Sequence, residues 1–327
     1  MPYLHSSSYC PPPGFAHGHL QTIFPSLFRK TPLITQQRER IETPDGDFID
    51  LDWGPNPGTS KLAILSHGLE GNSRRSYMQG MARALTAAGW QVLAWNFRGC
   101  SGEPNRSLQS YHSGSTGDLN TVIQHANALQ RHAEIALVGF SLGGNITLKF
   151  LGDYAPELNP KICAAVAFSV TCDLSSSAQQ LASWQNRIYM QRFLKTLRQK
   201  VREKALRFPQ QLSLEGLRHI KSFREFDDAY TGPIHGYRDA ADYWAQCSSL
   251  NSLEQIQVPA LLINAADDPF LSRSCFPVEL ARSHGYFHFE APRSGGHMGF
   301  VTFNRARQYW SEQRAVEFLT AHSLSSS

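Results

Sequence analysis

The sequence Ile135-Ala136-Leu137-Val138-Gly139-Phe140-Ser141-Leu142-Gly143-Gly144-Asn145-Ile146 changes character at its centre. The apolar run before Ser141 predicts a buried strand, and the pattern after it is typical of a helix. Between them stands the spacing G-x-S-x-G, in which a tight strand-to-helix turn exposes a serine hydroxyl and the glycines let neighbouring backbones approach closely. The stretch predicts Ser141 as a nucleophile, although the five-residue pattern also occurs in ordinary turns.

The segments on both sides of this turn alternate between strand and helix patterns. The apolar run at 62–65 predicts a strand buried on both faces, and 91–96, 164–168 and 260–264 predict further strands. Amphipathic stretches at about 77–88 and 119–129 predict helices between the strands. Residues 38–42 and 48–53 alternate around Pro44-Asp45-Gly46 and predict an antiparallel hairpin, and 286–290 and 305–321 predict the last strand and helix. This order implies right-handed crossovers and a mostly parallel sheet flanked by helices.

The same patterns divide the chain into three parts. Residues 1–36, rich in proline and turn-forming residues, predict an N-terminal arm with little regular structure that packs on the core. Residues 37–172 and 254–327 carry the strand patterns and form the core. Residues 173–253 carry none, which indicates an inserted helical cap.

The most periodic part of the cap, residues 187–208, combines an apolar face with many cations. A basic amphipathic helix can lie on an anionic membrane surface. A cap helix would instead turn its apolar face to the active site and leave its cations in solvent. We favour the second interpretation, and peripheral membrane contact stays open.

Composition limits the other partners. The 327 residues are 41% hydrophobic and 18% charged with a net charge of +4, which is too small a charge to indicate nucleic-acid binding. An export signal and a run of about eighteen apolar residues are both missing from the sequence, so no stable membrane insertion is expected. The six cysteines form no C-x-x-C pair and favour a cytoplasmic protein. His17 and His19 have no neighbouring ligands, and no metal site is predicted there.

Acyl transfer by serine needs a base, an acid that orients the base, and donors for the oxyanion. We assign the base to His297, which stands in a glycine-flanked loop after the last predicted strand. We assign the acid to Asp268, in the loop after 260–264, because a proline and then a hydrophobic pair follow it. Adjacent extended residues point in opposite directions, so Asp267 is the alternative.

The order Ser141, Asp268, His297 along the chain is that of α/β-hydrolases. The backbone N–H groups of Leu142 and Leu69 are the expected oxyanion donors.

Two further residues near predicted strand ends receive structural roles. His67 stands in the sequence His67-Gly68-Leu69 and is expected to shape that loop rather than to act as a second base. Ser101 also follows a strand, but Pro104 stands where a helix would be starting, so Ser101 is interpreted as structural.

Several motifs extend the pattern from about residue 15 to 320, and through them the chain resembles the YheT-like branch of the α/β-hydrolase superfamily. The resemblance implies the α/β-hydrolase fold, carboxylic-ester hydrolysis, and charge-relay positions at Ser141, Asp268 and His297. Eukaryotic relatives act on lipids or acylglycerols. The motifs are Gly18-His19-Leu20-Gln21-Thr22-Ile23, His67-Gly68-Leu69-Glu70-Gly71, Asn96-Phe97-Arg98-Gly99-Cys100-Ser101-Gly102-Glu103-Pro104-Asn105, Tyr111-His112-Ser113-Gly114, the Ser141 turn, Asn264-Ala265 with Asp267-Asp268-Pro269-Phe270, and Gly295-Gly296-His297-Met298-Gly299-Phe300.

The sequence therefore predicts a serine esterase that forms an acyl-enzyme on Ser141 and takes a small-molecule ester with an apolar acyl chain. This chemistry needs neither a metal nor an organic cofactor. Thioesterases and amidases use the same groups and stay open as alternatives. A non-catalytic ligand-binding protein of the same fold is the alternative from another class, disfavoured because all three charge-relay candidates are present.

Overall fold

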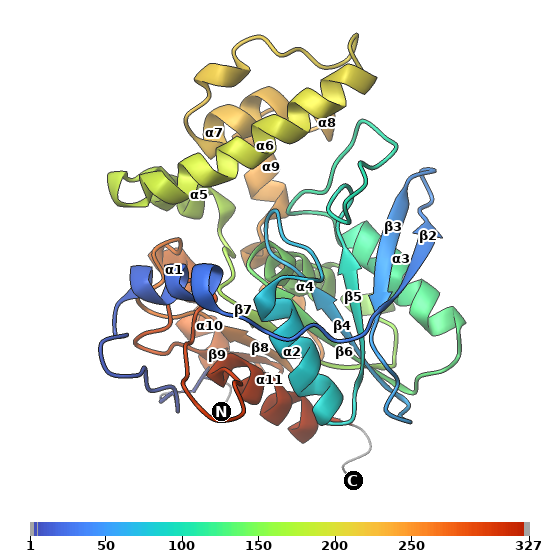
Figure 1. Ribbon diagram of the computed structural model, residues 1–327, viewed down its shortest axis with the longest axis vertical. Helices are drawn as coiled ribbons and strands as arrows, with labels where there is room; N and C mark the ends of the chain where they lie inside the picture. Colours follow the sequence, from blue (N-terminus) through green and yellow to red (C-terminus); the bar gives the residue numbers. More distant parts are fainter. Residues whose placement is uncertain (1–2, 5, 324–327) are drawn as a thin grey trace.

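The computed structural model describes residues 3–4 and 6–323 and places one large sheet between two layers of helices (Figure 1). Among the described residues the sheet has the strand order β1-β9-β8-β7-β6-β4-β5-β3-β2. β3 is antiparallel to β2 and to β5, and the remaining neighbours are parallel. This confirms the predicted mostly parallel sheet and the hairpin. The strands are β1 (Tyr3–Leu4), β2 (Gln37–Glu42), β3 (Phe48–Trp53), β4 (Lys61–Ser66), β5 (Gln91–Asn96), β6 (Glu134–Phe140), β7 (Ile162–Phe168), β8 (Ala260–Ile263) and β9 (Phe287–Glu290).

Strand β6 shows how the core forms on both faces of the sheet. Successive side chains of a strand point to opposite faces. Ile135 and Leu137 belong to a hydrophobic cluster that includes residues of α3 and α4, whereas Ala136 and Val138 belong to a second cluster with residues of α2 and α11. Every residue of β6 is buried, as expected for a central parallel strand. The core helices are α2 (Ser76–Ala87), α3 (Thr116–Ala128), α4 (Leu142–Asp153), α10 (Val278–Ser283) and α11 (Trp310–Ala321).

Between β7 and β8 the chain leaves the sheet and forms a group of helices above one end of the core (Figure 1). The longest of these, α6, closely matches the periodic stretch identified in the sequence. Its buried side chains, among them Met190, Leu194 and Val201, pack into a separate hydrophobic cluster. The elements are α5 (Leu174–Ala182), α6 (Arg187–Arg207), α7 (Phe223–Phe226), a π-helical turn (Asp227–Thr231), α8 (Gly232–Ile234) and α9 (Ala240–Cys247).

The expectation of little regular structure in residues 1–36 is wrong at one place, because α1 (Gly18–Phe28) is a helix of 11 residues. Its local signals are weak. No side chain caps its N-terminus, and Pro25 lies inside it and has no N–H to donate. Distant contacts hold it instead: the buried Gln21 donates to Tyr9 and accepts from the backbone N–H of Val301 at 2.9 Å. Tertiary packing therefore overrides local propensity here.

The C-terminal helix also differs from its predicted start. Residues 305–309 are not helical, and α11 begins at Trp310. The carboxylate of Glu312 accepts from the N–H of Tyr309 at 2.9 Å, which fixes the start of the helix from within its first turn.

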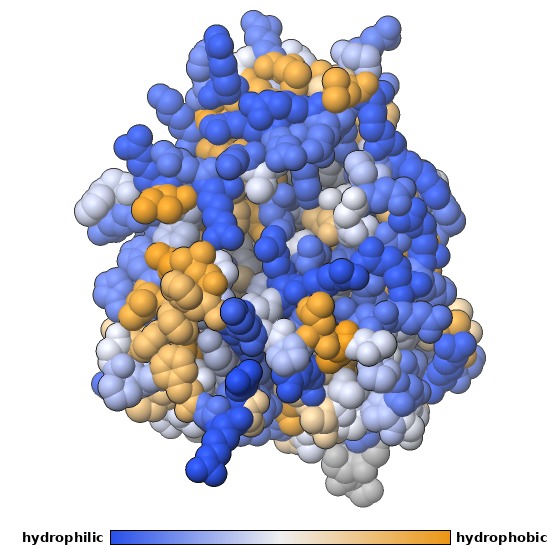
Figure 2. All heavy atoms as spheres, viewed as in Figure 1, coloured by the Kyte–Doolittle hydropathy of each residue, from blue (hydrophilic) through white to orange (hydrophobic). Residues whose placement is uncertain are grey.

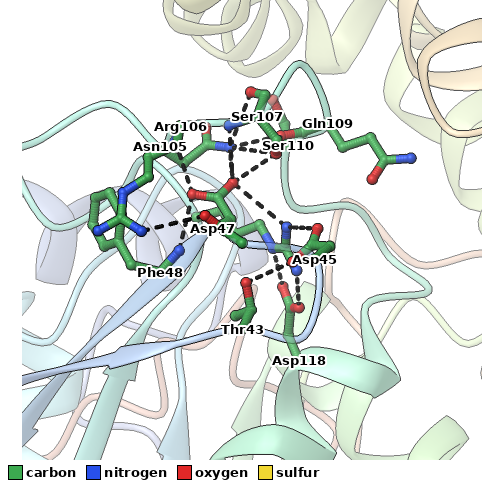
Figure 3. A network of polar contacts seen from close by, with 12 residues as sticks. Thr43, Asp45, Asp47, Phe48, Asn105, Arg106, Ser107, Gln109, Ser110 and Asp118 are labelled. Atoms are coloured by element: carbon green, nitrogen blue, oxygen red, sulfur yellow. Dashed lines mark hydrogen bonds and ion pairs between the residues drawn. The ribbon is translucent and has the colours of Figure 1, made fainter.

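A buried carboxylate, Asp47, ties the turn between β2 and β3 to the long loop that follows β5 (Figure 3). It accepts from the side chains of Asn105 and Ser107, each at 2.6 Å, and from the N–H of Arg106 at 2.8 Å. The Arg98 guanidinium of the same loop pairs with Asp118 of α3. The Asn96–Asn105 motif therefore has a structural role, because its Arg98 and Asn105 bind Asp118 and Asp47.

The same loop also contacts the helices between β7 and β8, which are called the cap below. Lys204 of α6 donates to the carbonyl oxygens of Ser107, Leu108 and Gln109 at 2.7–3.0 Å. A single ammonium thus holds several consecutive carbonyls of the loop beneath α6.

None of the helices in the described part of the chain combines the length and apolar composition needed to cross a bilayer.

Candidate active site

Ser141 lies between the end of β6 and the start of α4, on a turn that leaves no room for side chains at two neighbouring positions. Its φ of 52° is unusual for a residue with a side chain, so the turn is strained. A Cβ on Gly139 would stand 2.6 Å from the carbonyl oxygen of Gly143, and one on Gly143 would stand 2.4 Å from that of His67. Both positions therefore require glycine, and the spacing G-x-S-x-G follows from the packing of this turn.

The structure brings Ser141, His297 and Asp268 into one hydrogen-bonded chain. Nε2 of His297 lies 2.9 Å from Oγ of Ser141, and Nδ1 lies 2.9 Å from Oδ2 of Asp268. When Nδ1–H donates to the carboxylate, Nε2 is free to accept from the serine hydroxyl. The side chains of His297 and Asp268 are almost completely buried, at 5% and 0% exposure. The other oxygen of Asp268 accepts from the N–H of Phe270 at 2.9 Å, which fixes the carboxylate.

Asp267, the alternative acid, points elsewhere. Its carboxylate accepts from the hydroxyl of Ser294 at 2.8 Å and from the N–H of Gly296 at 2.9 Å. It therefore braces the loop that carries His297 without touching the imidazole.

The loop with Leu69 lies directly beside the serine. A Cβ on Gly68 would stand 3.3 Å from that of Ser141, and Leu69, Leu142 and Ser141 line the same cavity. The N–H of Leu142 belongs to the first turn of α4, where backbone N–H groups lack partners within the helix. Both predicted oxyanion residues thus lie beside Ser141.

His67 is fully buried inside this loop, with Nδ1 lying 2.8 Å from the carbonyl oxygen of Gly68 and Nε2 accepting from the N–H of Phe97 at 3.1 Å. Burial lowers the pKa of His67 to about 3, so its ring is neutral. The contacts agree with the expected loop-shaping role.

The sequence did not predict two residues that hold the backbone of the His297 loop. Oγ of Thr22 in α1 accepts from the N–H of His297 at 2.9 Å, and Oγ of Ser169, just after β7, accepts from the N–H of Met298 at 2.8 Å. Helix α1 also approaches the site closely, because a Cβ on Gly18 would stand 1.9 Å from the carbonyl oxygen of Asp267. The sequence signal was present in the Gly18–Ile23 motif, but nothing local revealed its partner.

A polar network joins the cap to the Leu69 loop. Lys200 of α6 pairs with Oε1 of Glu70 at 2.9 Å, and the hydroxyl of Tyr111 donates to the same carboxylate at 2.5 Å. The N–H of Glu70 donates back to the Tyr111 hydroxyl at 3.0 Å, and Glu70 has a φ of 55°. Both the backbone and the side chain next to Leu69 are thereby fixed.

A cavity extends from Ser141 into the cap and measures about 1180 Å³ when its opening to solvent is included. Most of its wall is aliphatic and aromatic, with residues from α5, α6 and α7; the apolar lining includes Leu174, Leu181, Phe193, Leu197, Val201, Phe223, Phe226, Ile234 and Phe270.

The remaining candidates lie outside this site. Ser101 is followed by no helix until α3, and its carbonyl oxygen accepts from Arg38 at 2.9 Å. His19 stacks on Tyr189 of α6, and Nδ1 lies 3.0 Å from the Tyr189 hydroxyl. Across the described residues, no group of three or more His, Cys, Asp or Glu side chains is arranged to hold a metal ion.

Comparisons with known proteins add relatives to this geometry. The sequence profile described as "alpha/beta hydrolase fold" matches residues 63–274. Similar proteins include the esterase candidate YheT of Escherichia coli (strain K12), 36% identical over 97% of this chain and 94% of its own length. Phospholipase ABHD3 of Homo sapiens is 29% identical over 90% of this chain and 74% of its own length. The solved structure of the Pyrococcus furiosus esterase Pf2001 has a TM-score of 0.60 at 18% identity, covering 88% of this chain and 91% of that one.

Proposed function

This chain belongs to the α/β-hydrolase family and is a hydrolase; on that premise, we propose that it cleaves carboxylic esters through an acyl-enzyme on Ser141. The observation that carries the proposal is the continuous chain of contacts from Ser141 through His297 to Asp268, each at 2.9 Å. Distances of this kind place the imidazole within reach of the proton it must remove.

Each group has one role in the proposed reaction. His297 takes the proton of Ser141 as Oγ attacks the acyl carbon, and Asp268 stabilises the imidazolium that forms. The N–H groups of Leu69 and Leu142 donate to the oxyanion. His297 then protonates the departing alcohol, and a water activated by His297 attacks the acyl-enzyme, releases the acid and restores the Ser141 hydroxyl.

The cavity supports an ester with an apolar acyl chain as the substrate. The lining of the cavity that contains Ser141 is mainly hydrophobic and extends into the cap. We include residues 173–253 in the proposal as a cap that forms the acyl pocket and excludes water from it. Residues 37–172 and 254–327 are the catalytic core in this division, and residues 1–36 are the arm that packs on it.

All six cysteines are free thiols, and five of them are buried. This supports the proposed cytoplasmic location, where thiols stay reduced.

Covalent labelling tests the function most directly. A fluorophosphonate should label Ser141, and Ser141→Ala should lower kcat for p-nitrophenyl butyrate on the order of 10⁶-fold, because the three groups act as a unit. Ser101→Ala is the matched control and should retain both labelling and turnover. A folded protein that neither reacts with the probe nor turns over short esters would overturn the proposal in favour of a binding protein.

A further inference from the structure

Helix α1 presents an apolar face to solvent beside the candidate active site. Leu27 and Phe28 are 62% and 64% exposed, and Ile23 is also exposed. Phe303, 60% exposed, continues this face because its ring packs edge-on against Phe24 of α1. Figure 2 shows hydrophobic residues gathered over α1, with a smaller group just above it at the start of α6. Contiguous exposure of this kind is uncommon on a soluble protein and marks a contact surface.

The start of α6 extends this surface. Trp184, in the turn before the helix, is 83% exposed, and Ile188 is 76% exposed. Arg192 follows Ile188 by four residues, so the two lie on the same helix face, and its guanidinium reaches Oγ of Ser26 in α1 at 3.3 Å. The two apolar groups are thus neighbours. We refer to Ile23, Leu27, Phe28, Trp184, Ile188 and Phe303 together as the α1–α6 surface.

The charge around the α1–α6 surface has one sign. The three segments that form and flank it, residues 1–38, 174–202 and 291–311, contain no Asp or Glu at all. They contain many Lys and Arg, and the exposed ones are Lys30, Arg38, Arg187, Arg192, Lys195, Arg202, Arg293, Arg305 and Arg307. In a chain with 31 Lys and Arg and 27 Asp and Glu, this segregation of charge is marked.

From these observations we infer that the α1–α6 surface docks on an anionic lipid bilayer. Aromatic and aliphatic side chains bordered by Lys and Arg match the requirements of an interfacial surface, which buries its apolar groups among the lipids and places its cations near the phosphates. A second copy of this chain is a poor occupant because it would oppose cations with cations. The inference does not depend on the esterase proposal, since binding is measured without turnover.

Docking would also orient the site. Helix α6 carries Ile188 on the α1–α6 surface and Phe193 and Leu197 in the wall of the cavity. The bilayer would therefore lie against the outside of a helix whose other side encloses the acyl pocket.

Sedimentation with vesicles tests the inference. The full chain should bind vesicles of equal parts phosphatidylcholine and phosphatidylglycerol and bind pure phosphatidylcholine at least about tenfold more weakly, because each basic side chain near the surface contributes about fivefold in affinity. Raising the salt concentration should weaken binding through screening.

Two sets of variants locate the surface. Leu27→Ser with Phe28→Ser should lower the partition coefficient at least about tenfold, since two apolar side chains leave the interface. Leu206→Ser is the matched control: Leu206 is 84% exposed at the far end of α6 and its loss should leave binding unchanged. Arg187→Glu with Lys195→Glu should also weaken binding, whereas Lys221→Glu, on another part of the cap, should not.

The melting temperature, compared with that of the wild-type protein, establishes that each variant is folded. Absence of binding to anionic vesicles by the wild-type protein would overturn the inference. So would equal loss with Leu206→Ser, or a dimer in light scattering that Leu27→Ser with Phe28→Ser dissociates.

Discussion

Adjacent carboxylates with different partners make Asp267 and Asp268 an internal test of the charge relay. Asp268→Asn should lower kcat by about 10⁴-fold, because an amide cannot stabilise the imidazolium and favours the wrong tautomer of His297. Asp267→Asn changes the same charge one residue away but leaves the contact of His297 with Asp268 in place. It should mainly lower the melting temperature, through weaker contacts with Ser294 and Gly296. Steady-state kinetics and thermal unfolding of both variants separate these effects, and equal losses of kcat would contradict the assignment.

Thr22 is a positioning residue for His297 in this scheme. Thr22→Val removes the oxygen that accepts the N–H of His297 and leaves that buried donor unpaired. We expect kcat to fall about tenfold with little change in KM, because the loop that carries the base loses its anchor while the acyl pocket is untouched. Thr22→Ser keeps the hydroxyl and should restore most of the loss. A decrease that serine fails to rescue would indicate a packing role for the Thr22 methyl group.

At the residue scale, the chemistry required of each group and the order of the residues along the chain were enough to select the three charge-relay candidates. A serine on a strained turn, a later acid and a still later histidine suffice to choose Ser141, Asp268 and His297, and the structure gathers them. Thr22 could not be found in that way, because the hydrogen bond joins residues 275 positions apart. The sequence contains the Gly18–Ile23 motif but does not show that Thr22 lies next to His297.

Among the elements, α1 shows where local rules fail. The proline-rich arm suggested irregular structure, yet Gly18 packs against the Asp267 backbone so closely that a Cβ would collide with it. The helix forms because its contacts with the core outweigh an uncapped start and an internal proline. The α6 helix, by contrast, was predicted almost to the residue because its apolar spacing is long and regular.

The link between α6 and the Leu69 loop can be measured as a coupling. Lys200→Met and Glu70→Gln should each lower kcat/KM several-fold, because Glu70 is the neighbour of Leu69 and its ion pair with Lys200 holds the loop under the cap. The double variant should lose less than the product of the two, with a coupling of about 1 kcal/mol. Arg202→Met, an exposed cation on the same helix, serves as the control and should have no effect. Strictly multiplicative losses would show that the pair does not act as a unit.

At the scale of the whole molecule, the sequence predicted the succession of strands but not their neighbours. Alternation of strand and helix patterns implied a parallel sheet, and the turn at Pro44-Asp45-Gly46 implied the hairpin. That β1 pairs with β9, or that β4 lies between β5 and β6, depends on contacts between distant segments that no window of sequence contains. The contact between the cap and the loop after β5 also joins distant segments, so the sequence did not predict it.

Asp47 connects several of these distant parts, so its removal should be felt by the entire fold. Its side chain is completely buried beside donors from the loop after β5, and Asp47→Ala would leave those donors unpaired. We expect the free energy of unfolding at neutral pH to fall by about 3 kcal/mol. Asp45→Ala removes the same charge from a partly exposed position on the same turn and should cost less than about 1 kcal/mol.

The pH dependence of this loss follows from the direction of the shift. Burial opposes the charged form of Asp47, but hydrogen bonds from Asn105 and Ser107 outweigh it and hold the pKa well below its ordinary value. A carboxyl whose pKa is lower in the folded than in the unfolded chain, where it is about 3.9, stabilises the fold fully above that value. The stabilisation is lost as the pH falls through the folded pKa. Urea unfolding of wild type and Asp47→Ala should therefore differ most at neutral pH and less in strong acid, and a difference that grows on acidification would place the missing stability in a group other than the Asp47 carboxylate.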